Sequence, residues 1–216
     1  MKKLSQVIAL AGVMSAGLVG VQAVQAEVSA SAAVANNYIF RGVLMGAGSA
    51  AVSGSLDYAA ESGLYAGVWG TSGDGTSDEY NLYVGFGGES GDFSYDVNVL
   101  GYVYPTTKID LGQFVELTAS VGFSGLGLSL TVPVADDKDF MGGEDYLYAK
   151  LSYGYDKFGV VIGNQTADAA PEYTHVDLSY AYSDNLSFVV SKVVDGDVVT
   201  TNRTLFQVSY SLPINL

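Results

Sequence analysis

Residues 79–105 contain two stretches in which apolar residues recur at every second position. The first stretch ends near residue 87 and the second begins at residue 93, with the polar segment GESGD between them. This period of two on both sides of a short glycine-containing break predicts a β-hairpin. Each arm is about ten residues long, which exceeds a typical soluble strand and matches a strand that crosses a membrane at a tilt. We therefore predict that the rest of the chain repeats this hairpin around a closed barrel.

The pattern recurs along the chain and gives twelve strand candidates, joined by connections that alternate in length. The connections near residues 61, 90, 125, 156 and 184 are short, and those near residues 45, 75, 109, 140, 168 and 198 are longer. Bacterial outer-membrane barrels combine an even strand number with short periplasmic turns and longer extracellular loops. The sequence therefore predicts an all-β fold, a single antiparallel transmembrane β-barrel of about 12 strands with both termini on the periplasmic side.

Two boundaries in this scheme depend on glycine and proline. The first strand is expected to run from Val28 to Arg41, because residues 42–49 contain three glycines and are expected to form a loop. After Pro105, residues 106–113 are expected to form another loop, which carries Lys108 and Asp110.

The first 26 residues are expected to lie outside the fold. Lys2 and Lys3 precede an apolar segment, and Val24-Gln25-Ala26 offers small residues at the positions that signal peptidase requires. We predict a removed signal peptide at residues 1–26 and an outer-membrane barrel at residues 27–216. No other apolar stretch reaches the roughly 18 residues that a spanning helix needs, so any membrane crossing must be made by strands.

Charge and cysteine content exclude several classes of function. Removing Lys2 and Lys3 from the nine basic residues leaves seven against 23 acidic ones, a net charge of −16. Nucleic-acid binding requires clustered Lys and Arg, so no nucleic-acid partner is predicted. The chain has no cysteine, which excludes disulfides and cysteine-based metal or redox sites. No cofactor is predicted.

Charged residues inside the predicted strands indicate which face is the lumen. A charge that points at lipid near the bilayer centre costs about 2–4 kcal/mol for Lys or Arg and less for Asp or Glu. The strand charges lie opposite Val, Leu and Phe, so the polar face must point inward. Lys192 is the exception, and it lies near a loop end where it can reach the headgroups. The predicted pore-lining residues are Arg41, Asp57, Tyr83, Asp96, Asn98, Tyr102, Glu116, Lys150, His175 and Asp177.

Three groups within the lumen have a functional and a structural interpretation. His175 and Asp177 share a strand face, which allows a His–Asp catalytic pair or an ordinary lumen hydrogen bond. We favour the hydrogen bond and predict no catalytic residue. The inward carboxylates give the pore a mild preference for cations, or they only hydrate and brace the wall. Tyr83, Tyr102 and Tyr104 could line a sugar path, but aromatic residues at the barrel rim are commoner.

An acidic loop near residue 140 is the candidate for calcium binding. Its residues are Asp136, Asp137, Asp139, Glu144 and Asp145. Hard cations prefer several carboxylate oxygens, but the spacing does not match an EF-hand loop. We therefore predict a solvated loop, which divalent ions could bridge to lipopolysaccharide phosphates, and no bound metal ion in the protein itself.

Three segments resemble the TorF-type family of outer-membrane porins, a group of conserved bacterial proteins of unknown function. Residues 37–42, NYIFRG, are similar to an early aromatic-x-Phe-Arg-Gly segment of that family. Residues 62–69, SGLYAGVW, resemble its Ser-Gly-Phe-Tyr-Ala-Gly-x-Trp, and the Tyr-Asp and Tyr-x-Tyr-Pro elements recur at residues 95–96 and 102–105. The resemblance covers about Val28 to Glu116. It departs at the end of the chain, which closes on Leu216 rather than on an aromatic residue. It implies a barrel and passive diffusion, with no substrate named.

The predicted function is a porin-like channel in the outer membrane of a Gram-negative bacterium, which passes small solutes by passive diffusion and is not an enzyme. The alternative is a non-conducting structural or adhesive barrel, and an enzyme that uses His175 ranks third. The expected partners are outer-membrane lipid and lipopolysaccharide, the barrel-assembly machinery and small solutes. The sequence indicates neither the solute nor the oligomeric state.

Overall fold

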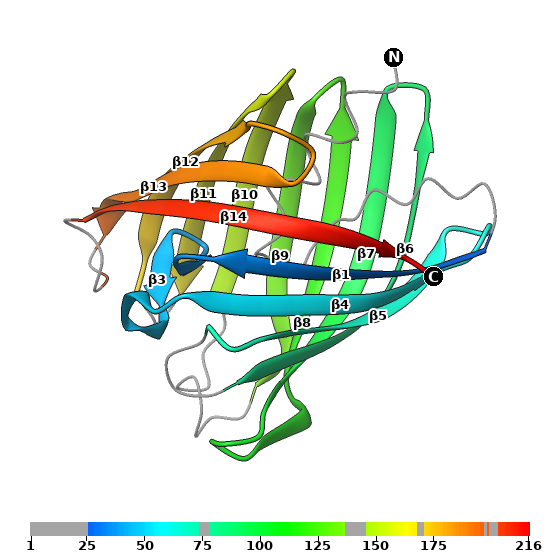
Figure 1. Cartoon of the computed structure of the whole chain (residues 1–216), viewed down its shortest axis with the longest axis horizontal. Helices are drawn as coiled ribbons and strands as arrows, with labels where there is room; N and C mark the ends of the chain where they lie inside the picture. Colours follow the sequence, from blue (N-terminus) through cyan, green and yellow to red (C-terminus); the bar gives the residue numbers. More distant parts are fainter. Residues whose placement is uncertain (1–25, 74–77, 137–145, 168–170, 197, 199–202) are drawn as a thin grey trace.

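The structure, a computed structural model, describes residues 26–73, 78–136, 146–167, 171–196, 198 and 203–216. Twelve strands close into one barrel in which each strand is antiparallel to both neighbours, and β1 pairs with β14 to complete the ring (Figure 1). The prediction of an all-β, twelve-stranded antiparallel barrel is confirmed. Among the described residues, no helix is long or apolar enough to cross a membrane.

The barrel strands lie close to the expected positions. They are β1 (Glu27–Ala35), β4 (Ala51–Ala59), β5 (Leu64–Thr71), β6 (Glu79–Ser90), β7 (Phe93–Tyr104), β8 (Ile109–Phe123), β9 (Leu126–Asp136), β10 (Tyr146–Tyr155), β11 (Phe158–Ala167), β12 (Tyr173–Ala181), β13 (Leu186–Gly196) and β14 (Thr204–Asn215). The predicted hairpin at residues 79–105 is β6 and β7, which pair from Tyr80 opposite Val103 to Ser90 opposite Phe93.

Two predicted boundaries are wrong. The first strand ends at Ala35 rather than at Arg41, and the segment expected to be a loop contains β3 (Val43–Met45) and a short 3-10 helix (Gly46–Gly48). Strand β2 (Tyr38–Phe40) pairs with β3 in a separate two-stranded sheet. At the other site, β8 begins at Ile109, so most of the predicted loop 106–113 belongs to a strand. Here strand pairing resumes directly after a tight turn and outweighs the loop propensity of Pro105 and the residues after it.

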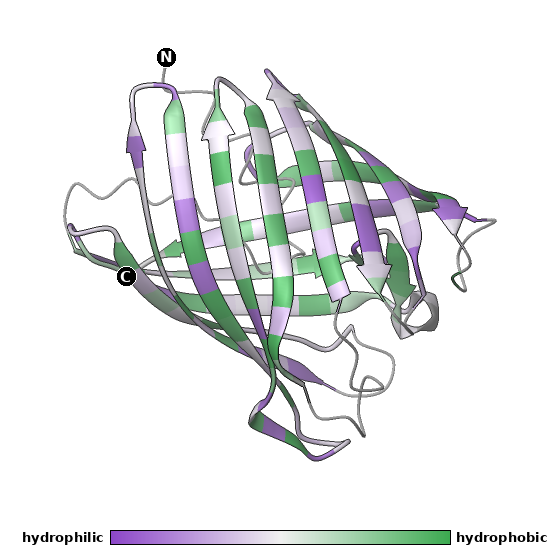
Figure 2. Cartoon of the chain, turned by 180° about the vertical axis from the view of Figure 1, so that it is seen from behind, coloured by the Kyte–Doolittle hydropathy of each residue, from purple (hydrophilic) through white to green (hydrophobic). Residues whose placement is uncertain are grey.

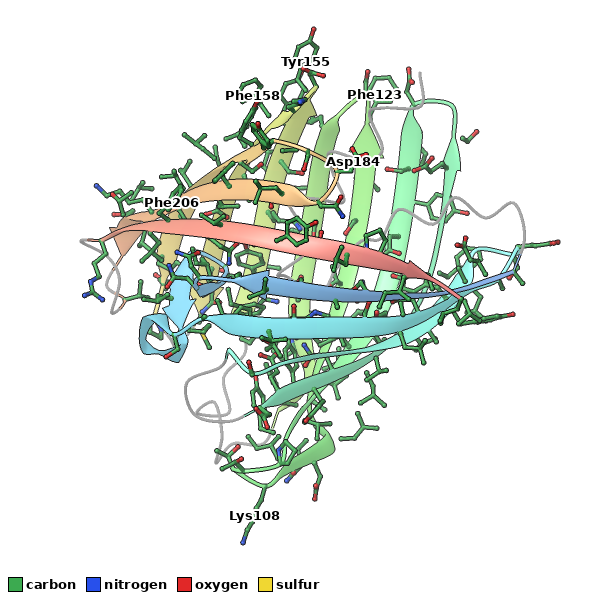
Figure 3. All side chains as sticks on the ribbon, viewed as in Figure 1. Lys108, Phe123, Tyr155, Phe158, Asp184 and Phe206 are labelled. Atoms are coloured by element: carbon green, nitrogen blue, oxygen red, sulfur yellow. The ribbon has the colours of Figure 1, made fainter. Side chains whose placement is uncertain are left out.

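The connections define two ends of the barrel. The short-turn end carries the tight turns after β4, β6, β8, β10 and β12, and the long-loop end carries the remaining connections. Figure 3 shows Phe123, Tyr155 and Phe158 at the short-turn end, and Lys108 at the opposite end, beyond β7 and β8. The segment that contains β2 and β3 belongs to the long-loop end, because it joins β1 to β4.

The outer surface is apolar, as a lipid-facing wall requires. Hydrophobic and hydrophilic residues alternate along the strands (Figure 2), and the outward positions of β6 and β7, such as Leu82, Val84 and Val97, are 41–48% exposed. Exposed aromatic rings gather near the short-turn end, where membrane proteins place rings at the headgroup level. They include Tyr58, Phe86, Phe93, Phe123, Tyr155, Phe158 and Tyr182. Lys192 is exposed on the outer face near the long-loop end.

Candidate functional site: a hairpin across the lumen

Residues Tyr38–Met45, which we call the lumen hairpin, fold into the barrel instead of continuing its wall. Their side chains contact strands on several sides of the lumen: Tyr38 reaches β5 and β6, and Arg41 reaches β8 and β10. In Figure 1 the hairpin lies next to β14 and β1 near the long-loop end. A segment with this position is the natural candidate for a constriction, since any solute that passes the barrel must pass it.

The turn of the hairpin places its charged residue at the tip. Arg41 and Gly42 both have positive φ, 48° and 80°, as the two central residues of a tight hairpin turn require. For Arg41 this left-handed conformation costs of the order of 1–3 kcal/mol, and such strain persists only where surrounding contacts hold the residue in place. Gly42 packs against the ring and Cβ of His175, so a side chain at this position has no room.

The base of the hairpin is fixed to β14 by two asparagines. The Asn36 side chain accepts a hydrogen bond from the backbone N–H of Val208 (2.7 Å) and donates to the carbonyl of Phe206 (3.2 Å). The Asn37 side chain also donates to Phe206 (2.8 Å), and Gln207 donates to the Asn37 carbonyl (2.7 Å). The β1–β14 ladder thus ends in side-chain bonds that turn the chain inward.

The flank of the hairpin is buried against β5 and β6. Tyr38 is only 2% exposed, and its ring lies 6.0 Å from that of Trp69, the single tryptophan of the chain. The Tyr38 hydroxyl donates to Glu79 Oε2 (3.1 Å), while Asn81 Nδ2 donates to Glu79 Oε1 (2.8 Å). Burial of this tyrosine and its bonded carboxylate makes the flank a packed contact rather than a loose one.

The tip is held by a buried ion pair. Arg41 Nη2 lies 2.7 Å from Glu116 Oε2, and the two side chains are 10% and 4% exposed. Tyr102 donates to the same carboxylate oxygen (2.8 Å), and Tyr146 donates to the other one. The guanidinium also lies over the rings of Phe40 and Tyr148, at 4.6 and 4.5 Å from their centroids. A buried charge requires this degree of pairing and hydrogen bonding.

Arg41 therefore stays charged at the centre of the hairpin contacts. Burial alone would lower the pKa of Arg41, but Glu116 and the tyrosines around it raise that pKa well above its ordinary value. The positive charge at the tip is therefore permanent.

His175 forms part of the wall behind the tip. Its Nε2 lies 2.8 Å from the Tyr148 hydroxyl, its Nδ1 lies 3.1 Å from Asp177 Oδ1, and the side chain is 1% exposed. This is the lumen hydrogen bond expected from the sequence, with Tyr148 as an additional member. Both ring nitrogens are engaged by the wall, and the chain of contacts orients the Tyr148 ring under Arg41. The absence of a catalytic role stays a prediction.

Three register shifts in the barrel lie beside this site. They occur at Tyr102/Tyr104 between β7 and β8, at Val115/Glu116 between β8 and β9, and at Thr174/His175 between β12 and β13. Bulges of this kind bend a strand and re-aim a side chain. Here they occur at residues that hold the hairpin, which indicates that the wall is shaped around it.

A continuous layer of buried inward-facing residues surrounds the hairpin. Every barrel strand contributes at least one buried residue to it. The layer includes Ala35, Ala51, Trp69, Asn81, Tyr102, Glu116, Thr131, Tyr148, Gly163, His175, Ser191 and Gln207. The described conformation is therefore narrow or closed near the long-loop end.

The lumen is more open towards the short-turn end. There many inward residues are partly exposed, and several of these are serines, including Ser31, Ser55, Ser120, Ser152 and Ser179. We call this part the vestibule. Its carboxylates are bonded to neighbours: Tyr65 donates to Asp96 (2.6 Å), Asn98 also donates to Asp96 (3.2 Å), and Tyr83 and Ser55 donate to Asp57.

The structure brings the predicted residues into two groups. Arg41, Tyr102, Glu116, Lys150, His175 and Asp177 lie at or beside the hairpin tip, and Asp57, Tyr83, Asp96 and Asn98 lie in the vestibule. Whether they line a conducting pore stays a prediction. Of the acidic loop, Asp137, Asp139, Glu144 and Asp145 lie outside the described residues. Within the described ranges, no group of three or more acidic or histidine side chains could hold a metal ion.

Sequence reasoning missed several residues that hold the hairpin, namely Tyr38, Trp69, Glu79, Tyr146 and Tyr148. A signal for the hairpin exists: two apolar runs, YIF and VLM, flank Arg41-Gly42. A two-residue glycine-containing break between such runs predicts a hairpin. Arg-Gly is a less familiar turn pair than Asn-Gly, and the first run also fits a continuation of the barrel wall.

Substituting Gly42 by Ala is expected to undock the hairpin tip. The Cβ of the alanine would overlap His175, and the alanine would have to adopt a positive φ. The substitution therefore destabilises the docked state by more than the roughly 0.4–1 kcal/mol typical of glycine effects. The measurement is the fluorescence of Trp69, which should shift to longer wavelength. Gly91→Ala is the control, because that glycine also has positive φ but an added Cβ there would meet nothing within 4 Å. An equal shift in both variants would contradict the expectation.

Comparisons with known proteins support the fold. The structure of a KdgM porin has a TM-score of 0.54 and 9% sequence identity, with 85% of this chain and 97% of that chain covered. A KdgM porin in complex with disordered oligogalacturonate has a TM-score of 0.49 and 7% identity, covering 88% and 99%. An active-site mutant of outer membrane phospholipase A from Escherichia coli has a TM-score of 0.44 and 12% identity, covering 98% of both chains. At 9% identity the likeness to the first of these structures supports the barrel fold alone.

A comparison with curated proteins finds no match. The family comparison is informative, because a model described as "Bacterial protein of unknown function (Gcw_chp)" matches residues 21–204, most of the chain. The matched region includes the lumen hairpin and nearly all the strands that surround it. The chain therefore belongs to the Gcw_chp family of bacterial proteins of unknown function.

Proposed function

We propose that this protein is a porin-like channel of the bacterial outer membrane that passes small solutes by passive diffusion. The observation that carries the proposal is a closed barrel with an apolar outer face and a polar lumen crossed by one internal hairpin. Charged and polar groups that face the interior give the lumen the polarity that a diffusion path for small solutes needs. The resemblance to TorF-type porins, whose quoted motif at residues 37–42 coincides with the hairpin, supports the same function.

In this proposal the lumen hairpin sets the aperture. It enters from the long-loop end, the extracellular side by analogy with other outer-membrane barrels, and closes the lumen above the vestibule. Opening requires the tip to leave Glu116 while Asn36 and Asn37 keep the base on β14. Strands β2 and β3 form a sheet separate from that of the barrel, so the contacts of Arg41 at the tip can break without breaking any pairing between barrel strands.

Charge in the lumen favours cations. The buried or partly buried acids that face the lumen are Asp57, Glu79, Asp96, Glu116 and Asp177, against the cations Arg41 and Lys150. Rings of carboxylates raise the local cation concentration in a low-dielectric pore. A mild cation preference is therefore part of the proposal.

Current through single refolded proteins in planar bilayers tests the channel and its selectivity together. We expect small, intermittent openings, because the described hairpin position is narrow, and a reversal potential in a KCl gradient with the sign of cation preference. A reversal potential of the opposite sign would remove the cation preference and leave the channel intact. The complete absence of current under every voltage and salt condition would favour the non-conducting barrel instead.

The packed layer around the hairpin is the observation that favours this second candidate, a structural or adhesive barrel. The discriminating measurement is the current of the wild-type protein with its hairpin present, because a lumen emptied by mutation would conduct under either function. Lipid and lipopolysaccharide around the apolar belt, and the barrel-assembly machinery, are the partners we propose under either function. An outer-membrane location reached through a removed signal peptide is common to both.

A further inference from the structure

Lys150 is placed at the boundary between the hairpin layer and the vestibule. It lies on β10 two residues after Tyr148, which contacts Arg41, and it shares the inward face with Tyr148 and Ser152. Its direct neighbours across the sheet are Ser129 on β9 and Gly163 on β11. Lys150 itself is partly buried, while Ser129 is 6% exposed.

The other buried or partly buried charges that face inward each have a partner in the protein. Arg41 pairs with Glu116 and His175 with Asp177, and the remaining carboxylates accept hydrogen bonds from tyrosine, serine or asparagine side chains. Lys150 forms no hydrogen bond and no ion pair with any residue in the described ranges. Asp177 acts on Lys150 electrostatically, but its Oδ1 is bonded to His175.

An ammonium group in this position is costly without a counter-charge. Its neighbours include buried Tyr148 and Ser129, and the charge of Arg41 repels it from the hairpin side. Burying an unpaired ion costs several kcal/mol even after relaxation. Three features therefore coincide: a cation with no partner among the described residues, serine side chains at its cross-strand and same-face neighbours, and partial exposure of Lys150 and Ser152.

We propose that Lys150 anchors a subsite for the carboxylate group of a small solute, on the vestibule side of the lumen hairpin. The Lys150 ammonium supplies the charge. Ser129 lies directly opposite Lys150 on β9, and Ser152 is the next residue on the inward face of β10. The arrangement captures an anionic group after it passes the hairpin, or before it passes when the solute moves outward. The proposal rests on the channel function for the solute that it serves, but binding itself does not require current, because the vestibule side is reached without crossing the hairpin.

Chloride serves as the first probe. Line broadening of the chloride NMR signal by the refolded protein in a neutral detergent reports ion binding without any conduction. We expect excess broadening for the wild type, its loss in Lys150→Gln, and its retention in Lys192→Gln, which removes an exposed lysine on the outer face. Sodium acetate should displace the chloride and restore the narrow line. Equal broadening in Lys150→Gln and the wild type overturns the site, and failure of acetate to compete overturns its assignment to carboxylates.

Reversal potentials separate this proposal from the channel itself. Lys150→Gln should strengthen the cation preference measured in a KCl gradient, while Lys192→Gln should leave it unchanged. If no variant conducts but the chloride broadening still depends on Lys150, the subsite stands and the channel proposal fails. If the wild type conducts and Lys150→Gln changes neither the broadening nor the reversal potential, the channel stands and the subsite fails.

Discussion

Excision of the lumen hairpin, residues Tyr38–Met45, is expected to raise single-channel conductance several-fold. The hairpin contacts β5, β6, β8 and β10 from within the lumen, so its removal joins the vestibule to the long-loop end. The barrel wall does not depend on it, because β1 pairs with both β14 and β4 without the excised residues. Planar-bilayer recordings of the two refolded proteins are the measurement.

Further measurements show whether the barrel survives the excision and whether the effect is specific to the hairpin. Far-UV circular dichroism should keep its β character, and the emission of Trp69 should shift to longer wavelength, because Tyr38 no longer covers that ring. Lys108→Ala, at the far end of the β7–β8 connection, is the matched control for a change at the same end of the barrel (Figure 3), and its conductance should equal that of the wild type. Unchanged current after excision, with Trp69 exposed, would show that the hairpin does not set the aperture.

The barrel could be predicted from the sequence because lipid and strand geometry leave few alternatives. Charged residues such as Asp96 and Lys150 cannot face lipid cheaply, and a one-residue slip would turn every one of them outward. The alternation of short and long connections then determined the number of hairpins. Each of these signals is local, and the closed ring of β1 and β14 follows from the need to pair every edge within a membrane.

The hairpin layer could be predicted only in part, because it depends on contacts between residues far apart in the chain. Parity placed Arg41 and Glu116 in the lumen, but nothing in the sequence relates two residues 75 positions apart as an ion pair. Tyr146 and Tyr148 resemble ordinary alternating strand residues, and their role appears only when Arg41 lies against them. The turn at Arg41-Gly42 has a recognisable signal, yet an uninterrupted first strand fits the barrel pattern equally well.

The ion pair at the tip yields the second large effect. Glu116→Ala removes the partner of a buried guanidinium, which typically destabilises a protein by about 3–5 kcal/mol. Arg41→Ala should cost less, because Glu116 keeps its bonds from Tyr102 and Tyr146. Urea unfolding of the refolded barrel measures both, and the exposed Lys157→Ala should stay within about 0.5 kcal/mol of the wild type.

The loss in Glu116→Ala has an upper limit, because the barrel has a second way to relieve the unpaired charge. Once the attraction is gone, the hairpin can leave the layer and return Arg41 to water, so the cost cannot exceed the free energy of docking. The double variant Arg41→Ala/Glu116→Ala should therefore be clearly less destabilised than the sum of the single variants. Glu116→Ala should also conduct more than the wild type and shift the Trp69 emission to longer wavelength. Additive losses, with Trp69 and the conductance unchanged, would mean that the pair braces the wall and does not hold the hairpin.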